Sequence, residues 1–256
     1  MSGNNFSVGL GIGTKSSKGD WLEVFYAKPI FEPCNSLLKA LREAVGYEGG
    51  NQAIDINVDQ LDAIANAFSS VKANEQQAIA ESLKATTQPL VLCILQDDDK
   101  PASTPEVYLK LQLISHRIVA PHGTNLDGMF GLLPNVAWTS DGAIALEELP
   151  ARQLQARIEG RTLDVQSVDK FPKMSNYVVP TGVRIGDASR VRLGAHLGEG
   201  TTIMHEGFVN FNAGTLGTGM IEGRKDGKAV FYRLADPRAK AIVSTMYDLF
   251  CGPDAQ

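Results

Sequence analysis

The sequence has few cysteines and no long apolar run. Its 3 cysteines, Cys34, Cys93 and Cys251, lie far apart in 256 residues, and none belongs to a C-x-x-C pair. This spacing argues against a zinc site or a disulfide framework and is typical of a protein in a reducing cytoplasm. No apolar stretch approaches the roughly 20 residues that cross a membrane. The N-terminus lacks a basic segment followed by an apolar one, so we expect neither a membrane span nor a signal peptide.

The chain also has no large excess of positive or negative charge. The net charge is −5 and the pI is about 5.4, which argues against a general binder of nucleic acids or anionic membranes. The chain contains no P-loop, no G-x-S-x-G and no H-E-x-x-H motif. Gly9 and Gly11 form a G-x-G, but no third glycine or helix follows, so we do not expect a dinucleotide site. The 43% apolar fraction suffices for one large or two modest domains.

Residues 1–170 have the pattern of an α/β domain. We expect strands at residues 6–14, 21–31, 90–95 and 163–168. We expect helices that begin near residues 35, 59, 74 and 104, and a further helix at residues 146–160. Asn35 and Thr104 are predicted N-caps, and Gly46 is predicted to end the first of these helices. Asn74 and Gln77 have the spacing of a capping box.

Polar residues in this first domain allow more than one interpretation. Asp97, Asp98 and Asp99 could hold a metal, but a solvated turn fits them better. His116 lies on the predicted face of the fourth helix and is interpreted as a packed residue rather than a ligand. Residues 121–139 are rich in Gly, Pro and Asn, which fits either a functional loop or a linker between two layers.

A six-residue period runs through residues 179–224. Aliphatic residues occupy every sixth position: Val179, Ile185, Val191, Leu197, Ile203 and Val209. Four residues after each comes a small or β-branched side chain: Val183, Ser189, Ala195, Thr201, Gly207 and Ala213. This period fits neither a helix nor an ordinary strand, and it is typical of a parallel β-helix built from hexapeptides, about three to a coil. We therefore expect about two coils with the aliphatic side chains inside, covered by a flanking domain or by other subunits.

Polar and aromatic side chains are dense within the second predicted coil. His205, Glu206, Asn210 and Asn212 lie beside Phe208 and Phe211, and Glu222 and Arg224 follow. Acyl transfer to an amine needs a base, donors for the oxyanion and cations for anionic substrates. Glu206, His205 or Glu222 could be the base, and Arg184, Arg190, Arg192 and Arg224 could bind carboxylates. The alternative is that the asparagines form ladder hydrogen bonds and the arginines cover solvated faces.

These residues occur in motifs that resemble one enzyme family. The segments are MHEGFVNFNAGT, GMIEGR, SVDKFPKM, VVPTGVRI and RVRLGAHLGEGTT, with LEVFYA, YLKLQLISHRIV and LLPNVAW in the first domain. Over residues 1 to about 224 the sequence resembles tetrahydrodipicolinate N-succinyltransferases, in the longer form found in actinobacteria and pseudomonads. The resemblance implies a left-handed parallel β-helix and succinyl transfer from succinyl-CoA to the amine of ring-opened tetrahydrodipicolinate, on the diaminopimelate route to lysine. It also implies a homotrimer in the cytoplasm, with active sites between neighbouring β-helices.

The resemblance also implies roles for single residues. Glu222 matches the proposed catalytic glutamate of the family, which is thought to carry the acyl group as a mixed anhydride. Arg224 matches a contact to succinyl-CoA. Glu206 matches a carboxylate that can hold Mg²⁺ near the trimer axis. Ser189 stands where some relatives have the second metal carboxylate, an aspartate. From the chemistry of their side chains, and not from the resemblance, Arg184, Arg192, His205, Asn210 and Asn212 are the expected substrate contacts.

The resemblance ends after Arg224, where the family continues with further coils that bind the CoA arm. Asp226 and Gly227 instead predict a hairpin turn, and Asp236 and Pro237 predict the start of an amphipathic helix. Its apolar face would comprise Ile242, Val243, Met246, Leu249 and Phe250. Residues 225–256 resemble the wing and last helix of arsenic-repressor-type winged-helix regulators, but no recognition helix precedes them, so we do not expect DNA binding.

The sequence thus predicts domains at 1–170, 171–224 and 225–256. Because the further coils that bind the CoA arm in the family do not follow Arg224, we expect weak or absent succinyl transfer. The alternative is a non-catalytic, truncated or fused β-helix that serves as an oligomerisation module.

Overall fold

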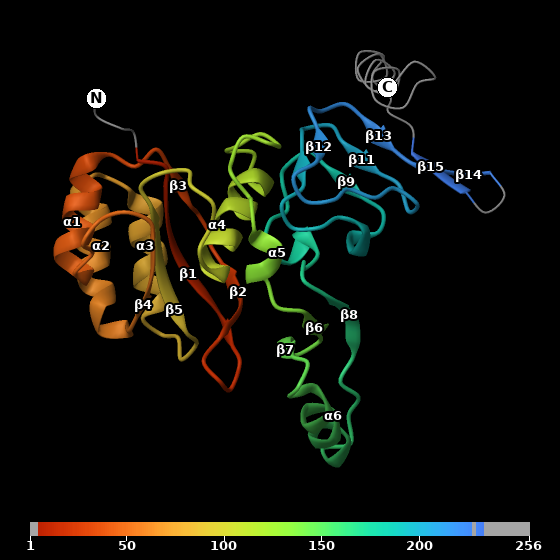
Figure 1. Ribbon diagram of the computed structural model, residues 1–256, viewed down its shortest axis with the longest axis horizontal. Coiled ribbons are helices and arrows are strands. Elements are labelled where there is room, and N and C mark those ends of the chain that lie inside the picture. Colours follow the sequence, from red (N-terminus) through yellow and green to blue (C-terminus); the bar gives the residue numbers. More distant parts are fainter. Residues whose placement is uncertain (1–4, 227–228, 233–256) are drawn as a thin grey trace, which may run out of the picture.

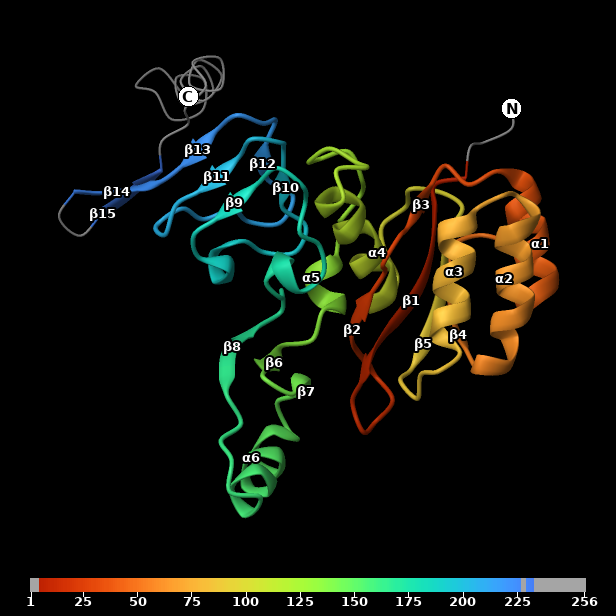
Figure 2. The ribbon, with the colours of Figure 1, turned by 180° about the vertical axis from the view of Figure 1, so that it is seen from behind.

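The N-terminal part is an antiparallel sheet with helices on both faces. The computed structural model describes residues 5–226 and 229–232. The sheet contains β1 (Ser7–Lys15), β2 (Trp21–Phe25), β3 (Ile30–Phe31), β4 (Gln52–Ile56) and β5 (Leu90–Leu95). Its order is β2-β1-β5-β4, and β3 pairs with β1. Helices α1 (Asn35–Val45), α2 (Leu61–Ser70) and α3 (Asn74–Leu83) lie on one side, and α4 (Thr104–Ser115) lies on the other (Figures 1 and 2).

Strand β5 is buried on both faces because each face meets a helical layer. Leu90, Leu92 and Ile94 pack with α1, α2 and α3, whereas the alternate residues face α4. The apolar run that predicted this strand therefore divides between two cores. The 3-10 turn η1 (Val58–Gln60) leads into α2.

Several predicted details of this domain were wrong. The second predicted strand is interrupted between Phe25 and Ile30, and β4 was not predicted. Cys34, not Asn35, is the N-cap of α1. Ser103, not Thr104, is the N-cap of α4, although neither cap side chain accepts a hydrogen bond from a backbone N–H of its helix. The Ser103 hydroxyl instead donates to the Glu106 carboxylate at 3.0 Å. The capping box forms at Asn57 and Gln60, before α2, rather than at Asn74 and Gln77.

Helix α4 is buried all round, not amphipathic. It lies between the sheet and the C-terminal part of the chain, so both of its sides are covered (Figure 1). Gly46 ends α1 in the left-handed conformation, as predicted, with φ of 71°. His116 follows α4 as its C-cap and is half-buried, and burial lowers its pKa, in agreement with a packed residue.

A small three-stranded sheet projects from the rest of the chain, and we call residues 134–169 the arm. It contains β6 (Val136–Thr139), β7 (Gly142–Ala145), α6 (Leu149–Ile158) and β8 (Val165–Asp169), with strand order β7-β6-β8. Figure 1 shows α6 at its far end. Helix α5 (Met129–Leu132) precedes the arm. The predicted irregular stretch 121–139 therefore contains a short helix and a strand, and α6 is shorter than predicted.

The C-terminal part is a coil of short parallel strands. It contains β9 (Arg184–Ile185), β10 (His196–Leu197), β11 (Thr202–Ile203), β12 (Gly214–Thr215) and β13 (Met220–Ile221), with the turns η2 (Met174–Asn176) and η3 (Ala188–Arg190). β11 lies between β9 and β13, and β10 pairs with β12. Every parallel pair joins residues 18 apart, such as Ile185 with Ile203 and Val191 with Val209. Three hexads therefore complete one turn, as predicted.

Most of the aliphatic side chains that were predicted to face the inside of the coil do so. Val191, Leu197, Ile203 and Val209 are buried together. The prediction that Val179 faces inward was wrong, because its side chain is 67% exposed and Val178 packs inward in its place. The turn η2 lies at the base of the coil, next to Val178. The six-residue spacing of inward side chains therefore begins only at Ile185.

The coil is fixed to α4 by specific contacts. Gly194 donates its backbone N–H to Ser115 Oγ over 2.9 Å, and Arg117 donates to the carbonyl oxygen of Thr181 over 2.8 Å. The rings of Phe171 and Phe211 stack at 4.4 Å. The predicted cover for a short coil is thus provided by the N-terminal domain on this side.

A hairpin follows the coil. Strands β14 (Gly223–Asp226) and β15 (Ala229–Tyr232) pair antiparallel, with Asp226 opposite Ala229, which confirms the predicted hairpin. The predicted helix after Pro237 lies outside the described residues. Among the described helices, none is long and apolar enough to cross a membrane.

Candidate functional site

Polar residues of successive turns meet at one corner of the coil. The corner lies between the face that contains β9, β11 and β13 and the face that contains Val191 and Val209. The 18-residue register places His205 one turn above Asp187. Asp187 caps η3 and accepts hydrogen bonds from the Ser189 N–H at 2.9 Å and hydroxyl at 2.6 Å. These bonds, and more weakly Arg190, lower the pKa of Asp187, so the corner carries a carboxylate.

The described residues of one chain give no support to the magnesium site that the resemblance implies. Glu206 faces Arg190, with 3.5 Å between the guanidinium and the carboxylate oxygen. Ser189 uses its hydroxyl on Asp187. Within the part of the chain that the structure describes, no three His, Cys, Asp or Glu residues are grouped to hold a metal. We therefore assign no step to a metal ion.

Glu222 lies at the same corner, one turn above Met204. The β11–β13 pairing, extended by the bond from Met204 N–H to the Ile221 carbonyl, sets this position. The Glu222 side chain is exposed. Arg224 follows in β14, opposite Phe231. The structure therefore brings Glu222, His205 and Glu206 to one edge of the coil, on neighbouring turns.

Arg192 joins the coil to the arm. Its guanidinium donates to Asp169 at 2.6 Å and to Asn210 at 3.2 Å. It also lies 5.6 Å from the ring centres of Phe171 and Phe208. Arg192 and Asn210 are thus in direct contact, and two aromatic rings lie beside the guanidinium.

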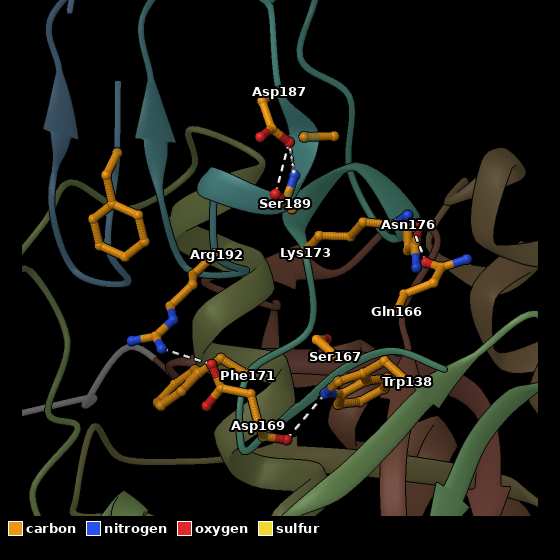
Figure 3. Close-up of a pocket in the computed structure, with 12 residues that line it drawn as sticks. Trp138, Gln166, Ser167, Asp169, Phe171, Lys173, Asn176, Asp187, Ser189 and Arg192 are labelled. Atoms are coloured by element: carbon orange, nitrogen blue, oxygen red, sulfur yellow. Dashed lines mark hydrogen bonds and ion pairs between the residues drawn. The ribbon is translucent and has the colours of Figure 1, made fainter. Parts of the chain in front are cut away.

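A pocket of about 400 Å³ opens beside Arg192, between the base of the coil and the arm (Figure 3). It is lined by Trp138, Gln166, Ser167, Asp169, Phe171, Lys173, Asn176, Asp187, Ala188, Ser189, Arg192 and Phe208. Its size is at the lower end of small-molecule sites. One side is aromatic and the other polar, which suits a short organic molecule with a charged end.

Of the five predicted substrate residues, only Arg192 lines this pocket. Asn210 reaches it through Arg192, and His205 lies one turn above Asp187. Asn212 has φ of 54° and accepts the His122 N–H at 2.7 Å, while its amide nitrogen lies 3.2 Å from His122 Nδ1. It therefore joins the coil to the loop after α4. Arg184 is exposed on β9.

The pocket contains residues that the sequence analysis did not single out. Asp169 and Lys173 come from one segment and Trp138 from another, and the three residues share no spacing. The segment SVDKFPKM, which already carried the family resemblance, contained two of them. Treating its charged residues as site candidates would have identified Asp169 and Lys173.

Comparison with known proteins agrees with this architecture. The family description "Tetrahydrodipicolinate N-succinyltransferase N-terminal" matches residues 42–131, and "Tetrahydrodipicolinate N-succinyltransferase middle" matches residues 133–173. A Pseudomonas putida 2,3,4,5-tetrahydropyridine-2,6-dicarboxylate N-succinyltransferase is 57% identical over 224 residues, which is 88% of this chain. The chain belongs to the tetrahydrodipicolinate N-succinyltransferase family.

Other relatives give the same result. A Vibrio cholerae protein of the same name is 56% identical over 219 residues, 86% of this chain and 64% of its own length. A Campylobacter jejuni crystal structure, described as a candidate 2,3,4,5-tetrahydropyridine-2-carboxylate N-succinyltransferase, has a TM-score of 0.74 at 28% identity. It covers 83% of this chain and 61% of its own. The chain spans 65% of the length of the P. putida relative.

Proposed function

We propose that this chain is an N-succinyltransferase that moves the succinyl group of succinyl-CoA to the amine of ring-opened tetrahydrodipicolinate, on the diaminopimelate route to lysine. The observation that carries the proposal is the 57% identity over 88% of the chain to a relative named for this transfer. The exposed carboxylate of Glu222, at the corner shared with His205 and Glu206, supports it.

In the proposed reaction, the Glu222 carboxylate attacks the thioester carbonyl of succinyl-CoA. The C–S bond breaks, the CoA thiolate leaves, and a succinyl–glutamyl anhydride remains. The acceptor amine then attacks the succinyl carbonyl, the C–O bond to Glu222 breaks, and the carboxylate is restored. His205, on the turn below, takes the proton that the amine loses, and Glu206 is the alternative base.

The remaining predicted residues would hold the two substrates. Arg224 contacts the acyl donor, and Arg184, Arg192, His205 and Asn210 contact the acceptor. The ion pair and aromatic contacts of Arg192 fix its guanidinium in advance, which limits the loss of side-chain freedom on binding. Asn212 acts through its contact with His122, by holding the loop after α4 against the coil.

The assembly is part of the proposal. We propose a left-handed coil and a homotrimer with sites between neighbouring coils. Leu216, which is 92% exposed, and Met220, at 52%, present apolar surface on the outside of the coil, and this supports association. Light scattering should give the mass of three chains.

The test is release of CoA from succinyl-CoA by the purified chain, with and without tetrahydrodipicolinate. We expect weak release that depends on the acceptor and that Glu222→Gln lowers at least a hundredfold. Glu199→Gln is the matched control, because Glu199 is an exposed glutamate on the same coil.

Two outcomes would count against the proposal. Equal release by Glu222→Gln would remove Glu222 from the chemistry. No release by a chain that circular dichroism shows to be folded would favour the non-catalytic oligomerisation module. The P. putida relative, assayed in parallel, would show whether the turnover of this chain is lower.

A further inference from the structure

Helix α6 has an exposed apolar stripe on the side that faces away from its own sheet. The stripe consists of Leu154, which is 63% exposed, and Ile158, which is 71% exposed. These residues are four apart, so they lie one above the other on the helix. Ala156 is buried against the arm sheet, and because each residue turns the helix by about 100°, it lies on the opposite side of α6. The core of the arm therefore leaves this stripe open.

The arm holds the α6 stripe well outside the rest of the chain. Figures 1 and 2 both show α6 at the far end of the arm, away from α1 and α2. Large apolar side chains that lie next to each other on an exposed helix are typical of a surface that binds another protein. The arm thus presents the stripe where a neighbouring molecule can reach it.

A groove of about 360 Å³ runs between α1 and α2. It is lined by Ala40, Glu43, Ala44, Ala63, Asn66, Ala67 and Ser70. Because most of these side chains are short, the groove can accept the larger side chains of another helix. Glu43 is exposed, and it forms no ion pair across residues 5–226. The groove is therefore apolar at its centre and carries a carboxylate at its edge.

Arg157 places a positive charge beside the α6 stripe. It follows Leu154 by three residues and immediately precedes Ile158, so it borders the stripe on the helix surface. Its guanidinium donates to the Thr162 hydroxyl at 2.9 Å, and no described carboxylate pairs with it. A guanidinium has five N–H donors, so further donors are available. The stripe and the groove are thus complementary in shape and in charge.

We propose that α6 of one chain docks into the α1–α2 groove of a second copy of this chain. Leu154 and Ile158 lie against the groove alanines, and Arg157 pairs with Glu43. Helices commonly pack in this way, with a ridge of residues four apart in a groove of the partner. The contact joins two different surfaces, so it is heterologous and repeats from copy to copy until a ring closes. In the proposed homotrimer, three such contacts would close the ring.

Cross-linking between two distinguishable chains tests the contact directly. In both chains serine replaces every cysteine except Cys93, which is buried. One chain adds Ala63→Cys in the groove, and the other, with a larger tag, adds Ile158→Cys on the stripe. A short bismaleimide should join the two chains. In the control, Lys100→Cys replaces Ala63→Cys at an exposed position outside the groove, and it should give at least tenfold less product.

Sedimentation equilibrium measures the strength of the contact. Leu154→Asp should weaken self-association at least tenfold and leave the thermal midpoint unchanged, because the side chain is exposed. Gln153→Asp, at an exposed position beside the stripe, is the control and should associate normally. Arg157→Glu and Glu43→Arg should each weaken association. A chain that carries both changes should associate more tightly than either single variant, because the exchange restores the ion pair.

Several results would overturn the inference. Cross-linking at Lys100→Cys as efficient as at Ala63→Cys would show that the groove is not the binding surface. A cross-link within one chain that carries both Ala63→Cys and Ile158→Cys would place α6 on its own groove. A chain that does not self-associate, or one whose association Leu154→Asp leaves unchanged, would exclude the contact. None of these measurements depends on CoA release, so failure of the proposed succinyl transfer would be seen separately.

Discussion

Lys110 in α4 donates from its ammonium to a carboxylate oxygen of Asp98 over 2.6 Å. The lysine side chain is fully buried, and its other donors reach the carbonyl oxygens of Asp99 at 2.6 Å and Asn125 at 2.9 Å. Asp98 also accepts the Thr124 hydroxyl at 2.7 Å. The run of aspartates, interpreted from sequence as a solvated turn, therefore closes over a buried charge and joins the end of β5 to the loop after α4.

Removal of Asp98 should leave this buried ammonium without a counter-charge. We expect Asp98→Ala to lower the free energy of unfolding by about 3 kcal/mol, measured by urea denaturation. Asp98→Ala combined with Lys110→Met should be less destabilised than Asp98→Ala alone. Asp97→Ala is the control for charge removal in the same turn. A double variant that is less stable than both single variants would contradict this interpretation.

Close approach of successive turns requires glycine at position 214. A Cβ there would lie 1.9 Å from the backbone oxygen of His196, so the turns would have to separate. We expect Gly214→Ala to cost about 3 kcal/mol. A Cβ at position 219 would have its nearest neighbour 3.8 Å away, so Gly219→Ala introduces no clash. This control still includes the lower conformational entropy that alanine gives the unfolded chain. Equal midpoints of thermal unfolding for the two variants would exclude the steric explanation.

Glu23 should make the protein less stable as the pH rises. Burial raises its folded pKa above the ordinary value of 4.5, although bonds from Thr14 and Tyr177 oppose the shift. The folded state therefore binds more protons than the unfolded state above pH 4.5, and stability falls through that window up to the raised pKa. Glu23→Gln should thus gain stability relative to the parent between pH 4.5 and neutrality.

The matched change at an exposed glutamate, Glu48→Gln, controls for the lost charge. Unfolding free energies at several pH values give the comparison. Parallel pH profiles for Glu23→Gln and the parent chain would show that the Glu23 carboxyl does not titrate differently in the two states.

The stacked rings of Phe171 and Phe211 should hold the coil to the rest of the protein. Their planes differ by 7°, and Phe130 meets both rings edge-on. Because Phe211 is partly buried, we expect Phe211→Ala to cost about 2 kcal/mol, measured as a lower unfolding midpoint. Val179→Ala, at a 67% exposed position of the same coil, should change stability by less than about 0.5 kcal/mol. Similar losses in both variants would show that the stack has no special role.

The sequence predicted the local periodicity of the fold well. The hexads around Leu197 and Ile203 correctly predicted parallel turns of 18 residues, because the six-residue spacing of inward side chains can be read directly from the sequence. Val179 was misassigned because the turn at Met174 closes the coil from outside the repeat. β4 was missed because its residues are only half-buried and lack a clear alternation of apolar side chains.

The candidate site was predictable only where it belongs to the repeat. Arg192 and Asn210 contact each other because they stand 18 residues apart, one full turn. Lys173 and Trp138 approach the same pocket from outside the repeat, through the way the arm packs on the coil. A single sequence contains no signal for that packing, and the partners of Lys110 were hidden for the same reason.

The 18-residue register has a consequence for changes of chain length. Loss of one complete turn would bring each inner aliphatic residue onto the equivalent residue of the next turn, so the remaining layers would still stack. Loss of a single hexad between His205 and Glu222 would keep the side chains inward but move every later residue to the next face, so Glu222 would leave the corner that it shares with His205. Loss of one residue would turn the following strand inside out. Natural or engineered length variants of this coil should therefore keep their site only when they differ by whole turns.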